Sequence, residues 1–156
     1  MLDAVEAQMV GSGLAMAVDV PRWYDTSSNL VSINYDGVTK NLMQHVFDRV
    51  DELGIMDYIV GPGDIYSDAL NELNYAMQLG KKVTIGVETI DLASYGGGNG
   101  SVSFWTTSCS QMENALDDVF TLVGNNNKLP GFNRMAVHAY WNDKNGVMSG
   151  YKYLCQ

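Results

Sequence analysis

The stretch GKKVTIGVETI (residues 80–90) has the pattern of a helix end followed by a buried strand. Gly80 is a typical residue to close a helix, and the apolar run 83–87 has the length of a strand. The strand ends on a carboxylate, Glu88. In parallel α/β folds the ligand site lies at the C-terminal ends of the strands, so Glu88 is a candidate functional residue.

Strand-like and helix-like segments alternate along the rest of the chain. Apolar runs predict strands at residues 14–20, 55–60 and 134–140, and a short strand-like piece at 102–105. Helical spacing predicts helices at residues 2–9, 39–54, 67–80 and 110–123, with Gly54 and Gly80 as C-caps and with Ser110 and Glu113 as a capping box. This alternation is typical of an α/β fold with a parallel sheet covered by helices. Two architectures fit: four units of a (β/α)8 (TIM) barrel, which is a half barrel, or an open doubly wound sheet.

Composition limits the possible functions. The 156 residues are enough for one domain, residues 1–156, and 46% of them are hydrophobic. The formal net charge of -9 and only nine basic residues argue against a nucleic-acid partner. No apolar run is long enough to predict a membrane helix, and the N-terminal residues lack the pattern of a signal peptide. The glycine-rich stretches 61–64 and 96–100 do not match phosphate-binding motifs, so we expect no cofactor.

Four polar side chains follow the predicted strands. Asp19, Asp64, Glu88 and His138 would face the same end of the sheet. Each also has a structural interpretation: Asp19 and Asp64 as helix caps or solvated loop residues, Glu88 in a buried ion pair, and His138 as a hydrogen-bonded core residue. With no second histidine nearby, His138 is a poor metal ligand, and Cys109 and Cys155 are too few for a metal site. The two cysteines could pair in an oxidising compartment or remain free thiols.

Aromatic residues gather at the same strand ends. They are Trp23, Trp105, Tyr140 and Trp141. Sugars stack their apolar faces on such rings and bind carboxylates and imidazoles through their hydroxyls, so these residues indicate a carbohydrate ligand. Packing beneath the loops is the alternative. Hydrolysis of a glycosidic bond needs two carboxyl groups; Glu88 is a candidate for one, and Asp19 or Asp64 for the other.

The segments LNYAMQLGKKVTIGVET, VSFW and GFNRMAVHAYW resemble the C-terminal half of a group of glycoside hydrolase-like (β/α)8 barrel proteins, many of them uncharacterised and exported. The resemblance covers about residues 14–141. It implies that the four strands are the fifth to eighth of a barrel and that Glu88 occupies the position of the nucleophile. The acid/base glutamate of that clan would end the fourth strand, which this chain does not contain. The segment GPGDIYSD also departs from the usual ending of the sixth strand.

A half barrel exposes sheet edges and apolar surfaces. We therefore expect a piece of a larger barrel, a rearranged strand order, or a homodimer that completes a barrel. If the chain is active, Glu88 is the nucleophile or base and Asp19 assists, while Trp23, Asp64, Trp105, His138, Tyr140 and Trp141 bind the sugar. The rivals are a non-catalytic carbohydrate-binding module and a doubly wound domain that binds a small polar ligand. An extracellular location is implied only by the resemblance.

Overall fold

The computed structural model describes residues 2–140, 142–144 and 147–155. Its centre is a parallel sheet of four strands, in the order β1-β4-β5-β6. The strands are β1 (Ala17–Pro21), β4 (Glu52–Met56), β5 (Lys82–Glu88) and β6 (Phe132–His138). The predicted α/β class with a parallel sheet is thus confirmed. The strands follow chain order without the reversal that marks the switch point of a doubly wound sheet.

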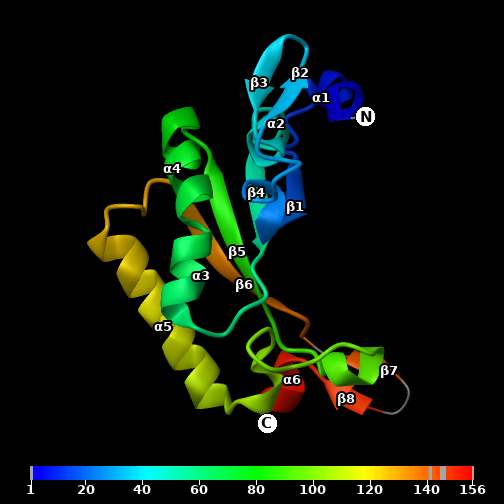
Figure 1. Ribbon diagram of the computed structural model, residues 1–156, viewed down its shortest axis with the longest axis vertical. Coiled ribbons are helices and arrows are strands. Elements are labelled where there is room, and N and C mark those ends of the chain that lie inside the picture. Colours follow the sequence, from blue (N-terminus) through cyan, green and yellow to red (C-terminus); the bar gives the residue numbers. More distant parts are fainter. Residues whose placement is uncertain (1, 141, 145–146, 156) are drawn as a thin grey trace.

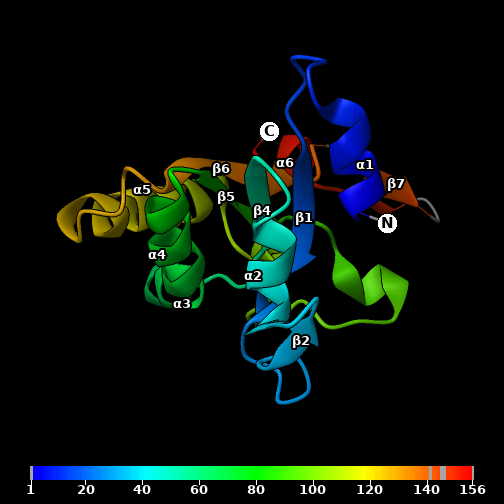
Figure 2. The same cartoon turned by 90° about the horizontal axis from the view of Figure 1, so that it is seen from above.

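Helices and two small hairpins surround this sheet (Figures 1 and 2). The helices are α1 (Leu2–Met9), α2 (Leu42–Phe47), α3 (Pro62–Asp68), α4 (Leu70–Leu79), α5 (Cys109–Asn125) and α6 (Tyr151–Leu154). Short 3-10 helices lie at η1 (Arg22–Tyr24), η2 (Leu92–Tyr95) and η3 (Phe104–Thr106). The hairpins pair β2 (Ile33–Tyr35) with β3 (Val38–Lys40) and β7 (Asn142–Lys144) with β8 (Val147–Ser149).

One face of the sheet carries the hydrophobic core. Alternate strand residues such as Leu53, Ile55 and Ile85 are almost fully buried, and they belong to one cluster with residues of α2, α4 and α5. Side chains alternate between the faces of a strand, so these helices cover the same face. Leu73 of α4 and Val119 of α5 are completely buried in this layer.

The opposite face of the sheet carries mainly small and polar side chains. The strand register aligns Asp19 with Gly54, Thr84 and Arg134, and one step further it aligns Met56 with Gly86 and Ala136. Glu88 and His138 form the last pair of this face, at the C-terminal ends of β5 and β6. Asp19 and His138 on this face line a cavity.

The helix predicted over residues 39–54 is wrong in its second half. Helix α2 ends at Phe47, and Glu52–Met56 is strand β4, which begins earlier than the predicted strand at 55–60. Gly54 lies inside the strand. The position leaves no room for a side chain, because a Cβ there would come within 1.8 Å of Asp19 Oδ1. The apolar residues Val50 and Leu53 are buried as predicted, but Val50 precedes strand β4 and Leu53 lies within it.

Two local predictions around α5 are also corrected. Residues 102–105 are not a strand: Phe104 and Trp105 lie in η3, which is capped by Ser103. The capping box is formed by Ser108 and Gln111 rather than by Ser110 and Glu113. Both serines precede the same apolar face, so spacing alone did not separate them.

A disulfide joins Cys109, the first residue of α5, to Cys155, which follows α6. Among the described residues no free cysteine remains. The sequence left this pairing open, and the structure ties the C-terminal segment to the helix layer. No helix in the described ranges is long and apolar enough to span a membrane.

Candidate functional site at the C-terminal ends of the strands

A cavity of about 390 Å³ lies on the polar face of the sheet. Its floor is made of small residues, Gly54, Gly86 and Ala136, and its rim includes Asp19, Tyr58 and His138. The small floor is required by the backbone, since a Cβ on Gly86 would lie 3.1 Å from the carbonyl oxygen of Ile55. A ligand can therefore approach the sheet closely while contacting residues of all four strands and of the segment after β4.

Glu88 is held rigidly where β5 ends. Its side chain is 2% exposed, and its Oε1 accepts hydrogen bonds from the backbone N–H groups of Thr89 and Ile90, both at 2.8 Å. The second oxygen, Oε2, lies 2.9 Å from His138 Nδ1. These hydrogen bonds hold the Glu88 carboxyl group in place behind the imidazole.

His138 is the exposed member of this pair. Its side chain is 55% exposed and lines the cavity, and its ring stacks on Tyr58 with the ring centroids 6.0 Å apart. With Nδ1 donating to Glu88, a neutral imidazole presents Nε2 as an acceptor. Thr89 anchors the same strand end, because its Oγ1 donates to the carbonyl oxygens of His138 and Ala139.

Tyr58 supplies a hydrogen-bond donor beside the imidazole. Burial raises the pKa of Tyr58, and the negative charges of Glu88 and Asp19 raise it further. The phenol therefore stays protonated at neutral pH. Tyr58 lies on the rim of the same cavity as Asp19 and His138.

Asp19 enters the site from the opposite edge strand. Its carboxylate leans across Gly54, as the 1.8 Å approach of a hypothetical Cβ shows. In register Asp19 aligns with Thr84, four residues before Glu88 on β5. Strand geometry then places the Cα atoms of Asp19 and Glu88 roughly 16 Å apart. A retaining carboxyl pair needs about 5 to 5.5 Å and an inverting pair about 6.5 to 9.5 Å, so the Cα separation within one chain exceeds both glycosidase geometries.

Other candidate residues lie elsewhere. Asp64 is in the first turn of α3, in the helix layer, and does not line this cavity. Trp23 lines a different cavity, and Trp105 lies in η3. Tyr140 is 67% exposed and stacks on Tyr151, while Trp141 lies outside the described residues. Of the predicted set, the structure thus places Asp19 and His138 on one cavity, with Glu88 hydrogen-bonded to His138.

Tyr58 is the rim residue that the sequence analysis missed. It lies within the run 55–60, which was predicted as a continuous strand with no functional residue. The real strand ends at Met56, and Tyr58 follows that end. A correct strand boundary would have placed it with the other residues at strand ends.

Comparison of the chain with protein-family models, with characterised proteins and with solved structures gave no match. Function is therefore inferred from the geometry of the site. The described residues around this cavity offer one histidine and no cysteine, so the polar groups suit the recognition of hydroxyls better than the binding of a transition metal.

Proposed function

We propose that the chain is a glycoside hydrolase-like, carbohydrate-active protein that hydrolyses a glycosidic bond. Glu88 serves as nucleophile or base, and Asp19 assists as acid or as a ligand of the substrate. One observation carries the proposal: His138, Tyr58 and Asp19 line a cavity with a small-residue floor at the C-terminal ends of parallel strands, and Glu88 is hydrogen-bonded to His138 behind it. That location is where parallel α/β proteins bind their ligands.

The geometry suits a sugar ring. Tyr58 donates a hydrogen bond, Asp19 accepts one, and His138 Nε2 does either according to its protonation. The flat floor of Gly54, Gly86 and Ala136 leaves room for a ring to lie against the sheet. Tyr58 and His138 stack on each other and present a mixed aromatic and polar wall.

A second copy of the chain completes this site in our proposal. The outer edges of β1 and β6 pair with no described strand, and the polar face has no covering layer among the described residues. A two-fold axis parallel to the strands would pair β6 of one copy with β1 of the other and keep all strands parallel. Eight strands are the number that closes a barrel filled by side chains. Two Glu88 carboxylates would then face one mouth.

The test compares three variants on a panel of aryl glycosides, with sugar binding followed by calorimetry. Glu88→Gln keeps the size of the side chain and should lower hydrolysis at least a hundredfold with binding changed by less than tenfold. Asp19→Asn should also lower hydrolysis. Glu113→Gln, at an exposed position on α5, is the matched control and should leave both unchanged. Hydrolysis by Glu88→Gln at the wild-type rate would remove Glu88 from the mechanism.

A non-catalytic carbohydrate-binding module is the second candidate. It is favoured by the environment of Glu88, which is 2% exposed and has both oxygens engaged. Glu88 would then only orient His138 toward a sugar hydroxyl. Saturable sugar binding without hydrolysis of any substrate, together with weaker binding in His138→Ala, would establish this alternative.

A further inference from the structure

A group of buried acids lies away from the Asp19–His138 cavity. Among the described residues, every buried side-chain oxygen or nitrogen without a hydrogen-bond partner belongs to Asp25, Asp57 or Glu72. Their exposed fractions are 7%, 0% and 2%. They come from three places in the fold, after η1, after β4 and on α4. Unpartnered buried polar atoms are rare in folded proteins, so their concentration in one place calls for a partner.

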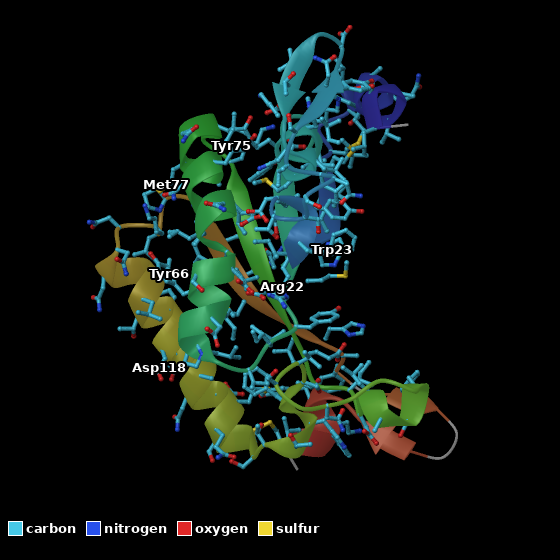
Figure 3. The ribbon with its side chains drawn as sticks, in the orientation of Figure 1. Arg22, Trp23, Tyr66, Tyr75, Met77 and Asp118 are labelled. Atoms are coloured by element: carbon cyan, nitrogen blue, oxygen red, sulfur yellow. A yellow bond between two sulfur atoms is a disulfide. The ribbon has the colours of Figure 1, made fainter. Side chains whose placement is uncertain are left out.

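One of these acids, Asp25, lines a cavity of about 260 Å³ that is separate from the site above. Its walls are Arg22, Trp23, Asp25, Thr26, Ser67, Asp68 and Asn71. None of these residues lines the cavity on the sheet face. Figure 3 shows Arg22 and Trp23 where β1 ends, on the side of the molecule that faces α3 and α4.

Asp25 is a wall residue with one unpartnered carboxylate oxygen. Its Oδ2 accepts a hydrogen bond of 2.7 Å from Asn71 Nδ2, whereas its Oδ1 is buried and accepts none. Arg22 does not satisfy it, since its guanidinium pairs with Asp68 on α3. Trp23 is 50% exposed and leaves an aromatic surface on the rim of the cavity.

The electrostatics of this region favour a positive ligand. Burial raises the pKa of Asp57 to about 7, with further increases from Asp68 and Asp64 that Arg22 partly offsets. Burial also raises the pKa of Glu72 to about 8, helped by the charges of Asp25, Asp57 and Asp68. One arginine thus faces several acids, and a second cation would relieve their mutual repulsion.

We propose that this cavity binds the primary ammonium group of a small organic cation. An ammonium group carries three N–H donors and no acceptor, which matches buried carboxylate oxygens that lack donors. The Trp23 ring adds a cation–π surface at the rim. This chemistry is shared by free polyamines and by amino sugars.

A divalent metal ion fits the region less well. Ligand atoms must converge on a shared ion, and within the described ranges the only such set of three lies within 4.8 Å at Cys109, Glu113 and Cys155. That set is not a metal site either, because its two sulfurs form the disulfide. The acids near Asp25 form no such converging set, which suits an organic cation better than a metal ion.

Calorimetry at pH 8 and low salt tests the proposal. Putrescine and glucosamine are the probes, and 1,4-butanediol and N-acetylglucosamine are their neutral counterparts. At least one amine should bind, and its neutral counterpart should not. Binding of putrescine alone assigns the site to a polyamine, and binding of glucosamine alone assigns it to an amino sugar. Asp25→Asn should weaken the binding at least tenfold, whereas Asp118→Asn, an exposed position on α5 (Figure 3), should change it less than twofold.

Three results would overturn the proposal: no binding of either amine, equal binding by Asp25→Asn, or displacement of the amine by calcium ions through the same carboxylates. Circular dichroism first establishes that each variant is folded. Trp23→Ala provides a second variant at a half-exposed ring, and it should weaken the binding severalfold while preserving the fold. Unchanged amine binding in Trp23→Ala and in Asp25→Asn would place the ligand elsewhere.

Discussion

The carboxyl groups of Glu72 and Asp57 are buried in the protein interior. Neither contacts a cation directly, and three of their carboxylate oxygens have no hydrogen-bond partner. Burying an unpaired charge is costly, so each carboxyl holds its proton well above the pH at which an exposed acid loses it. The pKa of Asp57 is raised to about 7 from the ordinary aspartate value of 3.8. The pKa of Glu72 is raised to about 8 from the ordinary glutamate value of 4.5.

The stability of the protein should therefore fall as the pH rises from 5 to 8. In this range the folded state binds more protons at Asp57 and Glu72 than the unfolded state, so the free energy of unfolding decreases with pH. The decrease should be on the order of 5 kcal/mol and should level off above about pH 9. Urea unfolding at several pH values measures it.

Glu72→Gln provides the specific check of that slope. The amide cannot ionise, so the variant should lose less stability than the wild type between pH 5 and 8 and should be the more stable of the two at pH 8. Glu6→Gln, at an exposed position on α1, should keep the wild-type slope. Identical slopes for Glu72→Gln and the wild type would contradict the buried-acid interpretation.

At the scale of elements, the disulfide connects the short C-terminal helix α6 to the start of the core helix α5. Helix α6 has four residues, and Cys155 joins it to the start of α5 across a sequence separation of 46. A cross-link stabilises mainly by limiting the unfolded chain, and a loop of this length is worth about 4 kcal/mol in the entropy model. Tyr151 adds a hydrogen bond of 2.8 Å from its hydroxyl to Glu113 on α5.

Replacing both cysteines by serine should lower the free energy of unfolding by about 2 to 4 kcal/mol. Dithiothreitol should have the same effect on the wild type and none on the double variant. Urea unfolding with and without the reductant measures both. If the reductant destabilises the double variant equally, the effect does not come from the Cys109–Cys155 bond.

The elements differ in how far the sequence could predict them. The segment 80–90 was predicted well, because Gly80 ends α4 in the left-handed conformation and β5 is buried on the helix side. The region 39–56 was not, since Val46, Val50 and Leu53 match helical spacing although Leu53 belongs to a strand. Local spacing cannot show that Gly54 must make room for Asp19, which lies 35 residues earlier in the chain.

The candidate site also contains residues that the sequence could predict and residues that it could not. Glu88 and His138 could be found because each ends an apolar strand, and β5 and β6 then place them side by side. The buried acids could not be found, because nothing in the sequence near Asp25, Asp57 or Glu72 reveals that three separate elements bury them together. Long-range packing, and not local pattern, creates that second region.

At the scale of the whole molecule, the main feature is that the sheet has two exposed edges, β1 and β6. Strands β1 and β6 each offer unpaired backbone groups on one side among the described residues, and such edges pair readily with another chain. The formal net charge of -9 opposes association, because two copies repel each other. Salt screens this repulsion, with a Debye length of about 10 Å at 0.1 M.

Light scattering should therefore detect a dimer whose fraction grows with protein concentration and with salt between 50 and 300 mM. Ala17→Lys places a charge on the exposed edge strand β1 and should shift the equilibrium to monomer, because an edge lysine disfavours strand pairing. Ala4→Lys, on the exposed side of α1, makes the same charge change away from the sheet and should leave the dimer fraction unchanged. A monomer under all these conditions would mean that the polar face is closed by something other than a second copy. The site would then have to work with Asp19, Tyr58, Glu88 and His138 of a single chain, and the binding module would become the better account of the protein.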